Sequence, residues 1–210
     1  MDLAVARRFP AVDGTMEEVI ALRPDLVVGS TFISPSARSA YARLGMRYEG
    51  FGITPRVADS IAQIRTLAAL TGHPERGEAL VARIEAALAA NKAPPGAPVA
   101  AVVWQSGGIV PGADTLISEL LTRTGFVNAA AAQGMHQADV LGLERMLAAP
   151  PRVIFAAGNP ASNEDRMLGH PALDSLKDTR KARIAPALLW CGGPTIVRAA
   201  QHLGAVRRSL

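Results

Sequence analysis

Two glutamates occupy equivalent places in a sequence repeat that spans the chain. Glu17 and Glu144 each open a short predicted helix, and Pro24 and Pro151 follow seven residues later, just before a predicted buried strand. The two glutamates are 127 residues apart, and so are the two prolines. Solenoid repeats recur every ~20–50 residues, so a repeat at this distance indicates two similar lobes. Each lobe therefore carries one carboxylate that could accept hydrogen bonds from a cationic partner.

A local role competes with a binding role at these two positions. An acidic side chain near a helix N-terminus gains about 0.3–1 kcal/mol from the helix dipole. Thr15 and Glu18 also fit a capping box, with Thr15 as the N-cap and Glu18 at the third helical position. This box accounts for Glu18 and leaves Glu17 free to point outward. Spacing alone therefore leaves both roles open for Glu17 and Glu144.

Small, polar and aromatic residues follow the predicted strands. In an open α/β lobe, ligands approach the carboxyl ends of the strands. Trp190, beside Gly192, is the best aromatic candidate for a stacking wall, whereas Trp104 lies within a buried strand and is expected in the core. The glycines at these strand ends either let the backbone approach a ligand closely or simply allow tight turns. The candidate ligand-binding residues are Ser30, Thr31, Phe32, Gln105, Ile109, His136, Asn159, Trp190 and Gly192.

Motifs for metal binding and catalysis are missing from the sequence. The four histidines (73, 136, 170 and 202) show no paired ligand spacing, and the single cysteine, Cys191, excludes a cysteine-rich metal site or an internal disulfide. Ser106 with His136 could be imagined as part of a hydrolase set, but there is no G-x-S-x-G elbow. No Walker A or strand-following G-x-G-x-x-G motif is present either. We therefore predict no catalytic residue, no metal site and no cofactor.

Composition narrows the class of protein further. The 210 residues carry 22 Lys and Arg against 18 Asp and Glu, a net charge of +4, and 49% of them are hydrophobic. The basic residues are scattered, so no nucleic-acid partner is predicted. The first ten residues do not form a signal peptide, and the longest dense apolar run, 99–104, is far shorter than the ~20 residues of a membrane span. These features predict a soluble protein with a substantial core.

Strand-like and helix-like segments alternate along the chain, which predicts a doubly wound α/β fold with mostly parallel sheets. Pro94-Pro95-Gly96 ends the longest helical stretch and is the natural boundary between lobes. We predict an N-terminal lobe over 1–74, a linking helix and boundary over 75–97, and a C-terminal lobe over 98–210. The predicted strands are 25–30, 47–51, 98–105, 152–157 and 182–186, and the predicted helices are 35–44, 57–70, 75–92, 114–124, 142–149 and 194–206.

Several motifs resemble those of one family in order and spacing. The segment 17–28 (E-E-V-I-A-L-R-P-D-L-V-V) resembles the first-lobe signature of ABC-transporter solute-binding proteins with a single helical backbone, the receptors for vitamin B12, ferric siderophores and haem. The segment 143–154 resembles the second-lobe signature. Segments 112–121 and 125–128 are similar to the family's G-x-x-S/T-x-I-x-E-L-L…G-G-x-N stretch, and 170–173 and 192–194 also fit. The resemblance covers nearly the whole chain.

The resemblance implies an architecture and a role. The expected fold has two Rossmann-like lobes joined by one long helix, with a shallow ligand cleft between them and no catalysis. Glu17 and Glu144 match the surface glutamates that dock onto arginines of the membrane permease. The chain would be a periplasmic monomer that delivers a small-molecule metal chelate. Only 16 residues precede Glu17, so the first lobe is expected to lack its leading strands, as a truncated start would explain.

The ligand stays open among an iron–siderophore, haem and cobalamin. Ile109 and Ala138 stand where the vitamin B12 receptor presents aromatic residues, which makes cobalamin less favoured. Haem receptors often offer Tyr or His to the iron. Tyr41 falls within a predicted helix and Tyr48 within a predicted strand, so His136 is the histidine best placed to face a cleft. The alternative is a cytosolic α/β small-molecule binding module, or a Rossmann-like enzyme, without a transporter partner.

Overall fold

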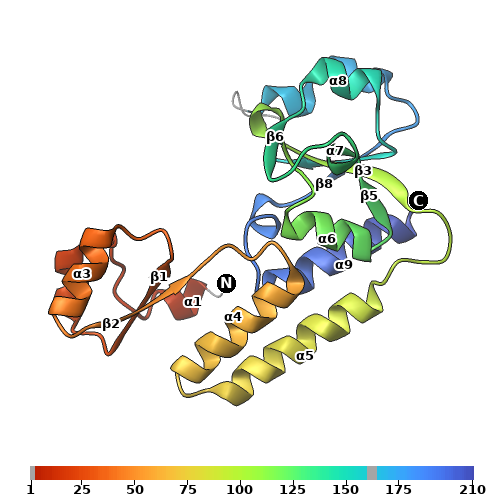
Figure 1. Ribbon diagram of the computed structural model, residues 1–210. Coiled ribbons are helices and arrows are strands. Elements are labelled where there is room, and N and C mark those ends of the chain that lie inside the picture. Colours follow the sequence, from red (N-terminus) through yellow and green to blue (C-terminus); the bar gives the residue numbers. More distant parts are fainter. Residues whose placement is uncertain (1–2, 160–164) are drawn as a thin grey trace. The chain divides into compact units, whose positions relative to one another are not determined.

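The computed structural model describes residues 3–159 and 165–210. The chain divides into two compact units, an N-terminal unit over Met1–Ile53 and a C-terminal unit over Thr54–Leu210 (Figure 1). Within the described residues, no helix is long and apolar enough to cross a membrane. The lobe boundaries expected near residues 74 and 97 stay a prediction.

The N-terminal unit is a small parallel β-α-β arrangement. Strands β1 (Leu26–Ser30) and β2 (Arg47–Phe51) pair in parallel from Leu26↔Arg47 to Ser30↔Phe51, and helix α3 (Pro35–Arg43) connects them. Two further helices precede β1, namely α1 (Leu3–Ala6) and α2 (Met16–Leu22). The expected helix stop is confirmed at Gly45, whose φ of 68° lets the chain reverse after α3.

Local capping chemistry sets the start of α2. The Thr15 side chain accepts the Glu18 N–H, and the Glu18 carboxylate accepts the Thr15 N–H at 3.2 Å. The Thr15 hydroxyl also donates to this carboxylate at 2.9 Å. The predicted capping box is therefore confirmed, and Glu17 is left exposed beside it.

The C-terminal unit is built around a four-stranded parallel sheet in the order β5-β3-β7-β8. A short antiparallel pair, β4 with β6, extends beyond the end of β3. The strands of the C-terminal unit are β3 (Val99–Gln105), β4 (Ile109–Pro111), β5 (Phe126–Asn128), β6 (Ala138–Val140), β7 (Val153–Ala157) and β8 (Arg180–Arg183). Its helices are α4 (Val57–Leu70), α5 (Pro74–Ala90), α6 (Leu116–Arg123), α7 (Ala129–Ala132), α8 (Leu143–Ala148) and α9 (Thr195–Arg208), with short 3₁₀ turns η1 (Ser106–Gly108), η2 (Arg166–Gly169), η3 (Pro171–Ser175) and η4 (Pro186–Leu188).

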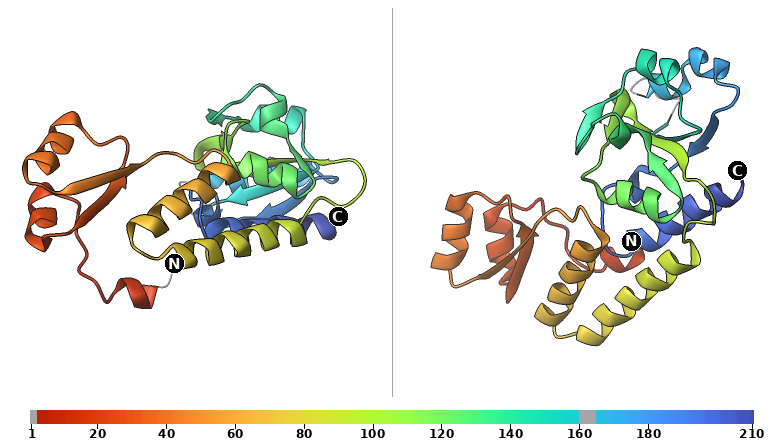
Figure 2. Two further views of the ribbon diagram at one scale, coloured as in Figure 1. Left: turned by 60° about the horizontal axis from the view of Figure 1, so that its bottom comes forward. Right: turned by 45° about the vertical axis from the view of Figure 1, so that its right-hand side comes forward.

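Alternating side chains of the central strand fill two separate cores. Ala101 and Val103 face a core that also contains Val57, Ile84, Leu120 and Leu203, from α4, α5, α6 and α9. Val102 and Trp104 face the second core, with residues of α7, α8 and η2. The views agree that α4, α5, α6 and α9 lie on one side of the sheet, and α7 and α8 on the other (Figures 1 and 2). Both faces of the parallel sheet are therefore covered, as a doubly wound fold requires.

The sequence repeat is also a structural repeat. Helix α2 leads through Pro24 into β1, and helix α8 leads through Pro151 into β7. The helices begin at Met16 and Leu143, and the strands at Leu26 and Val153, so each start is displaced by the same 127 residues. A proline cannot continue a helix and turns its predecessor away from helical geometry, which explains why both copies fold alike.

The α/β fold expected from the sequence is confirmed, with small local differences. The strand expected over 182–186 lies at Arg180–Arg183, because Pro186 already opens η4. The β4–β6 pair was not predicted, since strands of three residues give too short a pattern to recognise. Trp104 is fully buried, as expected, and its indole N–H donates to the Leu141 carbonyl at 2.9 Å.

Candidate functional site

The carboxyl edge of the C-terminal sheet carries the first group of candidate ligand residues. Gln105 ends β3 with its side chain buried, and the chain then turns through Gly107 and Gly108, whose φ angles are 68° and 80°. This turn brings Ile109 out to the surface. Asn159 follows the neighbouring strand β7 and is exposed. The two strands are paired up to Gln105↔Ala157, so the turn after β3 and Asn159 belong to one edge.

A carboxylate that the sequence interpretation did not include joins these segments. Asp165 lies just before η2 and is only 7% exposed. One of its carboxylate oxygens accepts the Ser106 hydroxyl, and the other accepts the Asn159 N–H at 2.5 Å. Asp165 lies in no recognisable motif and is 59 residues from Ser106, so the one available signal was a carboxylate shortly after a predicted strand. Ser106 and His136, the residues weighed above as part of a hydrolase set, contact different aspartates. Ser106 donates to Asp165, whereas His136 pairs with Asp114.

The loop before α9 carries the second group. Trp190 is 66% exposed, which suits a stacking surface. Next to it, the Gly193 N–H donates to the hydroxyl of the buried Ser60 at 2.7 Å. A Cβ at Gly192 would lie 2.4 Å from that hydroxyl oxygen, so the loop approaches α4 too closely for a side chain. The need for glycine at 192 thus arises because the loop backbone packs directly against the Ser60 and Thr54 side chains.

His136 lies in a third place, on the loop between α7 and β6. Its Nδ1 is 3.2 Å from the Asp114 carboxylate, and both side chains are mostly exposed. Backbone hydrogen bonds hold the two loops together, from the Ala113 N–H to the Met135 carbonyl and from the Asp114 N–H to the His136 carbonyl. His136 is therefore held against the loop between β4 and α6, which contains Asp114.

An open cavity of about 360 Å³ lies beside Asp114. Its walls include Arg56 and Glu119, and the Glu119 carboxylate accepts the Val57 N–H at 2.7 Å, at the first turn of α4. Glu119 also accepts from Arg123 at 2.7 Å. The lining residues include none of the candidate ligand residues. Glu119 here stabilises the start of α4, since a carboxylate at a helix N-terminus is favoured by the helix dipole.

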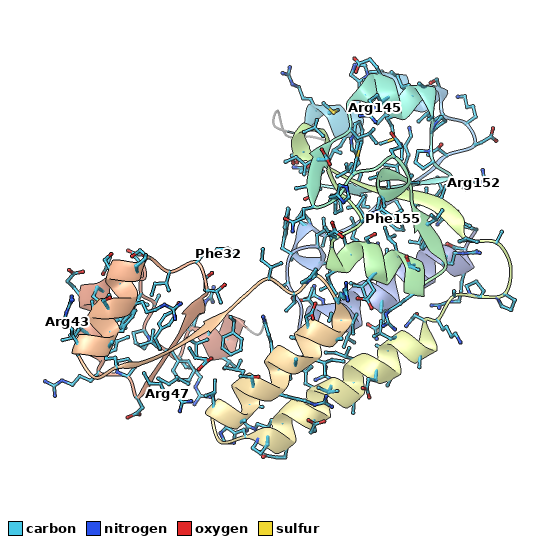
Figure 3. The ribbon with its side chains drawn as sticks, viewed as in Figure 1. Phe32, Arg43, Arg47, Arg145, Arg152 and Phe155 are labelled. Atoms are coloured by element: carbon cyan, nitrogen blue, oxygen red, sulfur yellow. The ribbon has the colours of Figure 1, made fainter. Side chains whose placement is uncertain are left out.

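In the N-terminal unit the candidates lie at the last residue of β1, Ser30, and on the loop that follows it. The Ser30 hydroxyl accepts the Phe32 N–H at 3.1 Å, and the Ser30 carbonyl accepts the Tyr48 hydroxyl at 2.6 Å. The loop is thus held in place while Thr31 and Phe32 remain exposed, Phe32 by 75%. Figure 3 shows the Phe32 side chain projecting from this loop. The Tyr48 hydroxyl donates to the Ser30 carbonyl, and the Tyr48 ring stacks on Tyr41 with ring centres 5.3 Å apart. Both tyrosines are therefore engaged in contacts within the N-terminal unit.

The two repeat glutamates are both exposed in the first turn of their helices. Glu17 lies in the first turn of α2 and Glu144 in the first turn of α8. Arg145, labelled in Figure 3, follows Glu144 on α8 and donates to the Gln133 side chain at 3.0 Å. Over residues 3–159 and 165–210, no three His, Cys, Asp or Glu side chains are grouped in a way that could hold a metal ion.

Comparison with known protein families identifies the class. The profile of the family described as "Periplasmic binding protein" matches residues 10–185, most of the chain. The chain therefore belongs to the periplasmic binding protein family. The expected family is confirmed, and with it the role of a solute-binding protein of the ABC-importer type.

Solved structures show the same fold. The chain is similar to the periplasmic haem-binding protein RhuT from Roseiflexus sp. RS-1, with 23% identity, a TM-score of 0.72, and coverage of 92% of this chain and 79% of that one. It is similar to the haem-binding protein HutB of Vibrio cholerae, with 18% identity, a TM-score of 0.75, and coverage of 91% and 80%. The vitamin B12-binding protein BtuF of Vibrio cholerae gives 17% identity, a TM-score of 0.66, and coverage of 92% and 78%. No match is found among curated protein sequences.

Proposed function

We propose that this chain is the periplasmic solute-binding component of an ABC importer, which captures a metal chelate and delivers it to a membrane permease as a monomer. The observation that carries the proposal is the pair of exposed glutamates, Glu17 and Glu144, at the same position of a repeated helix–proline–strand unit. Two carboxylates on separate rigid elements could bind two arginines of a permease, with an affinity that falls as salt rises.

The proposed ligand class is a bulky metal chelate with a partly apolar surface. Each unit has exposed apolar side chains in the segments that follow its strands, where an α/β protein binds its ligands: Phe32 in the N-terminal unit, and Ile109 and Trp190 in the C-terminal unit. An iron–siderophore, haem and cobalamin all fit this description. Two of the structural relatives described above bind haem, which makes hemin the first ligand to test.

Ligand binding can be tested by titration. Hemin, cyanocobalamin and a panel of ferric siderophores are added to the protein, and binding is followed by tryptophan fluorescence and, for hemin, by its absorption spectrum. We expect saturable binding of one class, with quenching that is reduced in Trp190→Phe because Trp104 is buried away from solvent. Saturation by none of these compounds would refute the proposed ligand class.

Docking can be tested separately with reconstituted permease and ATPase subunits. We expect the double substitution Glu17→Ala and Glu144→Ala to abolish stimulation of ATP hydrolysis while ligand affinity stays unchanged. Glu75→Ala is the matched control, because Glu75 is also an exposed glutamate in the first turn of a helix. Normal stimulation by the double variant, or an equal loss with Glu75→Ala, would contradict docking through these glutamates.

A further inference from the structure

One buried carboxylate holds together the segments that would face the ligand in the C-terminal unit. Asp165 accepts the Ser106 hydroxyl from the turn after β3 and the Asn159 N–H from the end of β7. Its backbone carbonyl accepts the Leu168 N–H at 2.9 Å and so begins η2. Ser106, 59 residues away in the sequence, and Asn159, six residues away, thus meet at one side chain.

The packing around this carboxylate leaves no space for adjustment. A Cβ at Gly158 would lie 2.6 Å from the Asp165 carboxylate and 2.8 Å from the Leu168 side chain. Contacts below 3.0 Å cannot be accommodated without movement, so Gly158 lets the backbone pack closely against Asp165. The contact of Asp165 with Ser106 and Asn159, called the joint below, is therefore tightly packed as well as hydrogen-bonded.

The partners of Asp165 adjoin the candidate ligand residues. Ser106 follows Gln105 and begins the turn that exposes Ile109, whose N–H donates to the Ser106 carbonyl. Asn159 is itself a candidate. Burial strengthens the two hydrogen bonds to Asp165, because the local dielectric is low. Asp165 therefore fixes the positions of Ile109 and Asn159 relative to each other.

We propose that Asp165 is a positioning residue for ligand capture, which holds the 105–109 turn and Asn159 as one preformed wall of the binding site. The proposal rests on the proposed function, because it concerns the site of that function. A wall fixed before binding spares the ligand the entropic cost of ordering two loops. Loss of the carboxylate should therefore weaken ligand binding even though Asp165 itself is buried.

Hydrogen exchange tests the joint without any ligand. In Asp165→Ala we expect the Asn159 amide and the 105–109 amides to exchange at least about tenfold faster, while amides in α9 stay protected. Asp165→Asn should remain close to wild type, because an amide can accept the Asn159 N–H and donate to the Ser106 oxygen. Ser106→Ala should loosen the 105–109 turn and leave Asn159 protected. Asp178→Ala, at an exposed aspartate of the same unit, is the control.

Ligand titration then tests the functional part with the metal chelate that wild type binds. We expect Asp165→Ala to bind about tenfold more weakly, with Asp165→Asn restoring most of the affinity. Wild-type exchange at Asn159 in Asp165→Ala, or unchanged ligand affinity in that variant, would overturn the positioning role while the proposed function stands. Failure of wild type to bind any of the chelates would instead refute the proposed function, and the positioning role with it.

Discussion

Gly192 offers the sharpest test of how the Trp190 loop is attached. A Cβ at this position would lie 2.4 Å from the Ser60 hydroxyl oxygen, 3.0 Å from the Ser60 Cβ and 3.1 Å from the Thr54 hydroxyl oxygen. Ordinary contacts begin near 3.4 Å, so Gly192→Ala must push the loop away from α4 by about 1 Å. Overpacking of this kind costs about 1–3 kcal/mol, and loss of the Gly193 N–H to Ser60 hydrogen bond adds about 0.5–1.5 kcal/mol. We expect Gly192→Ala to lower the free energy of unfolding by about 2–4 kcal/mol.

The assay is urea denaturation followed by circular dichroism, with the free energy of unfolding extrapolated to zero denaturant. Gly52→Ala is the control, because a Cβ there would have its nearest neighbour at an ordinary 3.5 Å. Ser60→Gly removes both atoms of residue 60 that the new methyl group meets. The double variant should therefore regain much of the stability that Gly192→Ala loses, apart from about 1 kcal/mol for a glycine inside a helix.

Two results would refute this reasoning. Gly192→Ala within about 0.5 kcal/mol of wild type would mean that the loop is free to move away from α4 at little cost. Strictly additive losses in Gly192→Ala and Ser60→Gly would mean that the methyl group and the hydroxyl do not meet.

Further predictions concern the core and the first capping box. Trp104→Phe removes the donor to the buried Leu141 carbonyl and should lower the free energy of unfolding by about 1–3 kcal/mol in the same urea assay. A decrease of less than about 0.5 kcal/mol would show that this hydrogen bond does not stabilise the fold. The pKa of Glu18 is lowered, first by the hydrogen bond from the Thr15 hydroxyl and then by backbone N–H groups. A lowered folded-state pKa gives stability that is present above the unfolded-state pKa and is lost as the pH falls through the folded-state pKa. Helicity measured by circular dichroism should therefore decrease when wild type is acidified below about pH 4.5. Glu18→Gln should remove the part of this decrease that Glu18 causes. A pH profile of Glu18→Gln identical to that of wild type would contradict the prediction.

Much of the local structure follows from short stretches of sequence. The Thr15–Glu18 capping box, the turn at Gly45 and the two helix–proline–strand units all appear where the pattern predicts them. The reason is that caps and proline turns are decided by residues within a few positions of one another. The place of Glu17 and Glu144 in the first turn of a helix was likewise predicted, and both side chains are exposed there.

The candidate site was predicted only in part. The segments after β3 and β7 were expected to carry ligand residues, and Ile109 and Asn159 are exposed there, as Trp190 is on the loop before α9. Gln105 is largely buried, because the last residue of a central strand points into the unit rather than out of its edge. Asp165 was missed, since a single aspartate in a loop resembles many others until its partners are known.

The sequence by itself determined the order of the longer helices and strands, the repeat, and the family to which the chain belongs. Only the tertiary structure decided which groups meet: the Asp165 carboxylate with the Ser106 hydroxyl across 59 residues, and the Ser60 hydroxyl with the Gly193 N–H across 133. Such contacts depend on the strand order β5-β3-β7-β8 and on which helix covers each face of the sheet. Hydrophobic patterning favours burial of a face but does not choose its partner, so these polar contacts become fixed only when the packed sheet excludes water from them.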